Sequence, residues 1–121
     1  MRVFKTKTFH QWTEKIGLDD IVLCKAIEEL VRGQYEANLG GYLYKKRIAF
    51  SGKGKSGGLR TIIAFRREDK AFFVYGFSKN EKQNITAKDA ETLKKLAKNY
   101  LTYSEEQMQK SIETHKFIEV L

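Results

Sequence analysis

With 41% hydrophobic and 12% aromatic residues among 121, the chain has the composition of one folded globular domain, which excludes a disordered tail. No apolar run approaches the about 20 residues that cross a bilayer, and the first residues lack the apolar core of a signal peptide, so we expect a cytoplasmic protein. The single cysteine, Cys24, excludes an internal disulfide, and no spacing of cysteine and histidine predicts a metal or cofactor.

The net charge of +8 is concentrated in one third of the chain. Residues 1–41 carry six basic and six acidic side chains, and so do residues 86–121. Residues 42–85 carry eleven basic and three acidic side chains, so the whole excess lies there. Such segregation is typical of a polyanion-binding face, because each neutralised phosphate releases counterions. A solvated run of charge is the alternative interpretation.

The first third of the chain predicts a strand followed by two helices. A short strand over residues 3–7 precedes a helix over residues 9–16, which Thr8 caps and Gly17 ends. A second helix is predicted from the helical spacing of its apolar residues, which are Leu23, Ile27, Leu30 and Val31. The asparagine, leucine and two glycines at 38–41 break this helix.

The middle third changes to the period of two that strands have. Alternation predicts a strand over residues 42–50, and apolar runs on both faces predict central strands over residues 59–66 and 71–78. Residues 68–70 read as a tight turn, so the economical topology is three consecutive antiparallel strands.

The last third returns to helices. Thr86 or Asn84 caps a helix whose apolar face repeats at helical spacing, with Leu93, Leu96, Ala97, Tyr100 and Leu101. The run at 104–107 fits a capping box that starts another helix, whereas residues 116–121 fit either a helical turn or a strand. Together these elements predict one domain over residues 1–121, of the α+β class. It would have a small, mostly antiparallel sheet with helices packed on one face.

Four glycines and two lysines lie in the segment 51–58 that joins the first two strands of the middle third. In such a meander the end of the first strand, the start of the second and the end of the third meet at one rim. The rim would therefore gather this segment with Arg60, Lys79 and Lys82. Residues 49–56 resemble a loosened nucleotide-binding loop, but a β-rich run follows where that motif needs a helix, which argues against nucleotide hydrolysis.

A cluster of lysine and arginine can bind RNA, and it can also cut it. RNA is cleaved without a metal when its 2′-OH attacks the adjacent phosphate, which requires a base, an acid and charge stabilisation. A lysine crowded by cations can act as the base, and arginine can hold the phosphoryl oxygens. The alternative is that these residues bind RNA without cutting it.

Two blocks in this region resemble the RelE/HigB-type toxins of bacterial type II toxin–antitoxin systems. They are KSGGLR at residues 55–60 and KNEKQNI at residues 79–85, and the similarity covers about residues 42–85. The resemblance implies a compact, microbial-ribonuclease-like fold and cleavage of mRNA, often on the ribosome. It also implies inhibition of translation and neutralisation by a cognate antitoxin, frequently a helix-turn-helix protein.

The resemblance also implies roles for individual residues. Arg60 would contact the scissile phosphate, Lys79 would stabilise the transition state or donate a proton, and Lys55 would hold the backbone or act as base. Lys53 would also hold the RNA backbone, and Glu81 would support the site. Three further basic residues are expected to bind RNA, namely Lys45, Arg47 and Lys82. The sequence departs from the pattern at Lys82, where arginine is commoner, and at Leu59, where an aromatic residue is commoner.

Two competing hypotheses share much of this evidence. One is the same fold acting as a non-nucleolytic poison of a protein target, as ParE-type gyrase poisons do. The basic trio of Lys53, Lys55 and Arg60 argues against it, because a gyrase poison does not need that constellation. The other is a non-catalytic RNA-binding module.

Overall fold

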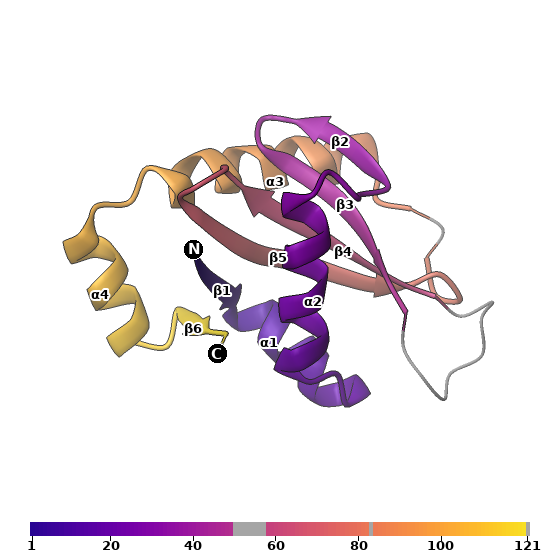
Figure 1. Ribbon diagram of the computed structural model, residues 1–121, viewed down its shortest axis with the longest axis horizontal. Helices are drawn as coiled ribbons and strands as arrows, with labels where there is room; N and C mark the ends of the chain where they lie inside the picture. Colours follow the sequence, from indigo (N-terminus) through magenta and orange to yellow (C-terminus); the bar gives the residue numbers. More distant parts are fainter. Residues whose placement is uncertain (50–57, 83, 121) are drawn as a thin grey trace.

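The computed structural model describes residues 1–49, 58–82 and 84–120. In these residues the chain forms one six-stranded sheet with helices on both faces (Figure 1). In chain order the elements are β1 (Arg2–Thr6), α1 (Lys7–Ile16), α2 (Asp20–Val31), β2 (Ala37–Gly40), β3 (Leu43–Ile48), β4 (Leu59–Phe65), β5 (Lys70–Ser78), α3 (Ala87–Leu101), α4 (Glu105–Glu113) and β6 (Phe117–Glu119). The sheet order is β2-β3-β4-β5-β1-β6. Every neighbouring pair is antiparallel except β1 and β5, so the predicted α+β class is confirmed.

The predicted meander of three antiparallel strands is present as β3, β4 and β5. Ile48 at the end of β3 pairs with Leu59 at the start of β4, and Leu59 pairs with Ser78 at the end of β5. These three strand ends therefore form a single rim of the sheet. Phe50, the expected last residue of the first of these strands, lies outside the described residues.

The expectation that helices pack on one face is wrong, because the sheet carries apolar residues on both faces. Every residue of β4 is buried, which requires cover on both sides. One face packs Ile63 and Phe73 against α1 and α2, and the other packs Ile62 and Phe72 against α3 and α4. In Figure 1, α2 crosses in front of the sheet and α3 lies behind it.

The helix starts follow N-capping side chains, with one difference from the expectation. Helix α1 begins at Lys7, and its cap is Thr6, whose hydroxyl oxygen accepts from the Phe9 N–H at 3.2 Å, so the predicted cap Thr8 is wrong. Strand β1 runs to Thr6, whose extended backbone suits a cap. The capping box of Ser104 and Gln107 is confirmed.

Two short strands complete the sheet at its edges. Residues 38–41 were expected to break a helix, but α2 ends at Val31, and Ala37–Gly40 forms β2, which pairs with β3 through Ala37 and Lys45. The turn into β3 places Tyr42 at φ 65°, a conformation that few residues other than glycine adopt. For residues 116–121 the sequence fits either a helical turn or a strand. The structure has a strand there, because β6 pairs with β1.

Candidate functional site

The rim formed by β3, β4 and β5 carries two arginines side by side. Arg47 and Arg60 pair across the ladder between β3 and β4, and Phe77 of β5 pairs with Arg60. A Cβ atom built on Gly58 would lie 3.0 Å from Nη1 of Arg60 and 3.4 Å from Nε of Arg47. Both guanidinium groups therefore lie against Gly58, in the place where a side chain would otherwise begin.

Arg60 is buried, and a carboxylate compensates its charge. Its relative exposure is 7%, and its Nε donates to the carboxylate of Glu36, at 2.8 Å to Oε1 and 3.2 Å to Oε2. A buried charge without a partner would be costly, so this pair is what allows a guanidinium group to lie within the sheet surface.

Lys45 extends the pair into a small network of charges. Its Nζ lies 3.7 Å from Oε1 of Glu36 and donates to Oδ1 of Asn84 at 3.4 Å. The network of Lys45, Arg47, Arg60 and Glu36 holds three cations and one carboxylate. Its net positive charge suits an anion such as a phosphodiester.

A backbone hydrogen bond places Lys79 at the same rim. Its N–H donates to the Gly58 carbonyl oxygen at 3.1 Å, directly beside the two arginines in the ladder. Ser78 then anchors the following turn, because its carbonyl oxygen accepts from the N–H groups of Glu81 and Lys82, each at 3.0 Å. The rim thus brings Lys79 to Arg60 although they lie far apart in the sequence.

Lys82 and Glu81 lie in this turn with other partners. Lys82 donates to the Tyr75 hydroxyl at 3.0 Å and lies 3.9 Å from Asp89. The hydrogen bond to Tyr75 raises the pKa of the Lys82 ammonium, which stays charged at neutral pH. Glu81 is exposed, and Lys53 and Lys55 lie outside the described residues.

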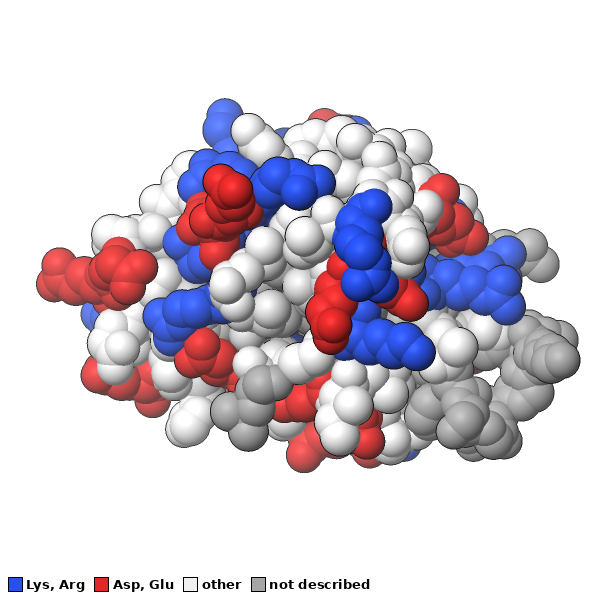
Figure 2. Space-filling model, in the orientation of Figure 1, with Lys and Arg blue, Asp and Glu red and all other residues white. Residues whose placement is uncertain are grey.

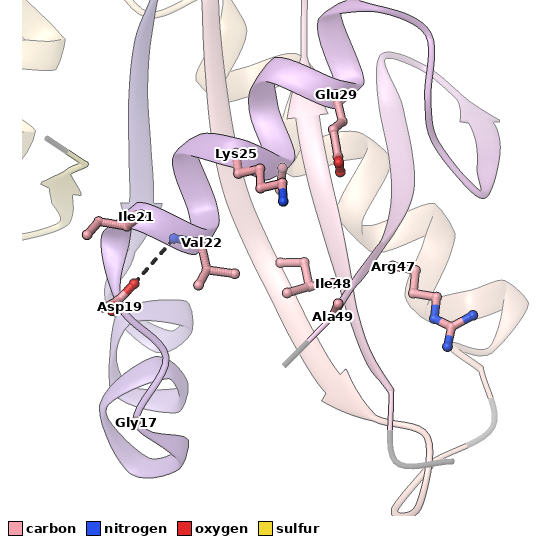
Figure 3. Close-up of a pocket in the computed structure, with 10 residues that line it drawn as sticks. Gly17, Asp19, Ile21, Val22, Lys25, Glu29, Arg47, Ile48 and Ala49 are labelled. Carbon is pink, nitrogen blue, oxygen red and sulfur yellow. Dashed lines mark hydrogen bonds between the residues drawn. The ribbon is translucent and has the colours of Figure 1, made fainter. Parts of the chain in front are cut away.

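The opposite face of the sheet has a different character. A groove of about 580 Å³ lies between α2 and the end of β3 (Figure 3). Asp19, Glu29 and Lys25 line it together with apolar residues, and Arg47 points away from α2. In Figure 2 acidic and basic side chains are interspersed over this face. The groove therefore offers no concentrated positive charge to a polyanion.

Two further features bear on the site's chemistry and surroundings. Within residues 1–49, 58–82 and 84–120, no three side chains of His, Cys, Asp and Glu gather where they would hold a metal ion. Across the same ranges, no helix combines the length and the apolar character that crossing a membrane requires.

Fold and site together define a small α+β protein with a positively charged rim on its sheet. The comparison with protein families then identifies the kind of protein. The model of the family described as "RelE toxin of RelE / RelB toxin-antitoxin system" matches residues 1–120, so the chain belongs to the RelE toxin family. The family pairs its toxins with an antitoxin of the RelB type. A search of the curated proteins finds no match.

Sequence reasoning missed Glu36, the carboxylate that compensates Arg60. Glu36 precedes β2, and its N–H donates to the Lys45 carbonyl oxygen at 2.8 Å, which aligns it beside the basic strands. The alternation of Tyr35, Ala37 and Leu39 around it is the signal that could have revealed this strand and its acidic residue.

Proposed function

We propose that this toxin is an mRNA endoribonuclease that inhibits translation, acting on the ribosome, and that it needs no metal. The observation that carries the proposal is the convergence of Nη1 of Arg60 and Nε of Arg47 on Gly58. Two guanidinium groups converging on one point suit the oxygens of a phosphodiester, which arginine binds with directed, charge-assisted hydrogen bonds.

The reaction that fits this site is internal transesterification of RNA. The 2′-oxygen attacks the adjacent phosphorus while its proton passes to a base, and the bond from phosphorus to the 5′-oxygen breaks as an acid protonates that oxygen. The products are a 2′,3′-cyclic phosphate and a 5′-hydroxyl end. Charge grows on the phosphoryl oxygens in the transition state, where preorganised donors are most effective.

We assign the roles from the positions of the side chains and from the family. Arg60 and Arg47 stabilise the pentacoordinate phosphorus, Lys79 donates a proton or adds charge, and Lys55 serves as base. RNA backbone on either side of the cleaved bond binds Lys45, Lys53 and Lys82, with Glu81 in support. Lys45 and Lys82 lie on or beside the strands that form the rim, which supports an extended backbone track.

The cognate antitoxin is proposed to be a helix-turn-helix protein that covers this basic face. Acidic side chains of the antitoxin would complement the excess of positive charge in residues 42–85. Pull-down of the neighbouring gene product, followed by competition with RNA, tests whether inhibitor and substrate share the surface.

The decisive experiment maps RNA 5′ ends after incubation with and without ribosomes. We expect discrete cuts within reading frames that bear 5′-hydroxyl ends. Arg60→Ala and Lys79→Ala should each remove the cuts and abolish growth arrest, with folding and antitoxin binding retained. Losing one such donor typically lowers kcat about 10²- to 10³-fold.

The other outcomes identify the competing hypotheses. Growth arrest with intact RNA and stalled gyrase would indicate a protein poison, and RNA binding without cuts would indicate a binding module. Full toxicity of the Arg60→Ala, Lys79→Ala double variant would refute the assigned site.

A further inference from the structure

We propose that Glu36 is a positioning residue that fixes the guanidinium plane of Arg60 so that its Nη side faces the phosphate. The inference rests on the proposed function and adds to it a specific acidic residue within a basic site. Its physical basis is that arginine has two usable hydrogen-bonding edges, and that a carboxylate can hold one of them while an anion takes the other.

The observed contacts divide the guanidinium of Arg60 in this way. Nε points to Glu36, at 2.8 and 3.2 Å from its two oxygens. Nη1 lies 3.0 Å from the point where a Gly58 side chain would begin, next to Nε of Arg47 at 3.4 Å from the same point. The Nε side is therefore held by a carboxylate. On the other side Nη1 lies against the backbone at Gly58, beside Arg47, and donates to the Leu59 carbonyl oxygen at 3.5 Å.

Burial makes this orientation a fixed one. The Arg60 side chain is 8% exposed, and Glu36 belongs to the segment that leads into β2 and is bound to Lys45 of β3 through its backbone. A long side chain free in water would lose conformational entropy on binding a phosphate, whereas Arg60 has lost it on folding. Preorganised donors of this kind are the ones that lower a reaction barrier.

Lys45 keeps the acidic partner from repelling the substrate. Its Nζ lies 3.7 Å from the same Oε1 that Arg60 contacts, so the negative charge of Glu36 is shared between two cations. A phosphodiester approaching Gly58 then meets Arg47 and the Nη edge of Arg60. The carboxylate lies behind that edge.

The test compares Glu36→Gln with Glu29→Gln, a matched control. Glu29 contacts the buried Lys46 at 2.8 Å on the other face of the sheet, and its side chain is 29% exposed against 33% for Glu36. We expect Glu36→Gln to lower kcat for RNA cleavage about tenfold or more with a smaller change in KM, since a displaced group can cost up to ~10²-fold. Glu29→Gln should leave kcat unchanged.

A second background separates positioning from a general loss of structure. Lysine has no second edge to hold, so in the Arg60→Lys background Glu36→Gln should change kcat less than about twofold. Glu36→Asp should recover part of the activity, and the shape of the pH–rate profile should stay the same in Glu36→Gln. Loss of the acidic limb of that profile would make Glu36 a proton acceptor and overturn the proposal, as would faster cleavage by Glu36→Gln.

A spectroscopic readout keeps this inference distinct from the proposed function. In NMR spectra of the arginine side chains, the Arg60 Nε–H should be protected from exchange in the wild type and in Glu29→Gln, and unprotected in Glu36→Gln. Wild-type protein that cuts no RNA would refute the proposed function and leave this measurement intact. Equal protection of the Arg60 Nε–H in both variants would overturn the positioning role.

Discussion

Two buried ion pairs lie on opposite faces of the same sheet and look alike by distance and burial. Lys46 contacts Glu29 of α2 at 2.8 Å, and Arg60 contacts Glu36 at 2.8 Å. The cation is 9% exposed in the first pair and 8% in the second. What differs is the surroundings of the cation, because Lys46 contacts a residue of helix α2, whereas Arg60 lies against Gly58 beside a second guanidinium group, that of Arg47.

This difference shows how one kind of interaction serves two purposes. The Lys46 pair fastens α2 to β3, so its contribution is to the stability of the fold. Under the proposed function, the Arg60 pair compensates a buried charge and holds the guanidinium group where its Nη side can meet a phosphate. Changes at the two faces should therefore separate into effects on cleavage and effects on stability.

The largest difference between effects on cleavage and effects on stability should appear when Arg47→Ala is compared with the neighbouring variant Lys46→Met. Arg47 is exposed and supplies one of the two guanidinium groups at Gly58, so its loss should lower kcat roughly 10²-fold. Stability should change by less than about 0.5 kcal/mol, as for other exposed positions. Lys46→Met should leave cleavage by the folded protein unchanged. Kinetics and urea unfolding of both variants measure this, and equal losses of kcat would contradict the comparison.

A smaller effect on cleavage is expected from Gly58→Ala. The added methyl group would lie 3.0 Å from Nη1 of Arg60, so the guanidinium group must shift from the position in which it would meet the phosphate. We expect about tenfold slower cleavage, equivalent to about 1.4 kcal/mol. Gly58 is not among the glycines with positive φ, so its backbone accepts alanine, but the crowding of Arg60 should lower the melting temperature slightly. Undiminished cleavage by this variant would place the phosphate elsewhere.

The smallest effect is a pH-dependent one on stability, from Glu29→Gln. The hydrogen bond from Lys46 lowers the pKa of Glu29 below its ordinary value of 4.5, so the pair stabilises the fold above that pH. This stabilisation is lost as the pH falls through the lowered pKa of the folded state. At pH 7 the variant should be less stable by about 1 kcal/mol, between an exposed pair and a buried charged hydrogen bond. Urea unfolding from pH 7 to pH 3 should show the gap closing at the acidic end.

The parts of the site that the sequence predicts are those that follow from strand ends. Alternation located β3, apolar runs located β4 and β5, and antiparallel pairing then brought Arg60 and Lys79 to one rim. Glu36 gains its role from the pairing of β2 with β3, where the local signals conflict. The residues around Glu36 alternate as in a strand, whereas asparagine, leucine and glycines at 38–41 are typical of a helix stop as much as of a tight turn. The choice of Thr6 over Thr8 as a cap likewise depends on where β1 ends.

The parallel pairing of β1 with β5 could not be predicted from the sequence either. Val3 pairs with Ala71, and pairing over such a separation leaves no local periodicity to detect. Helices on both faces, by contrast, were implied by the apolar runs at residues 59–66 and 71–78, which are typical of strands buried on both sides.

The pairing of β1 with β6 also has a practical consequence for engineering. The Val120 N–H donates to the Val3 carbonyl oxygen at 2.8 Å, and Figure 1 shows the two ends of the chain close together. They lie at the sheet edge opposite β2, away from Arg47 and Glu36. A short linker can therefore join them, and new termini opened in the turn at 66–69 would give a circular permutant that keeps the guanidinium pair intact.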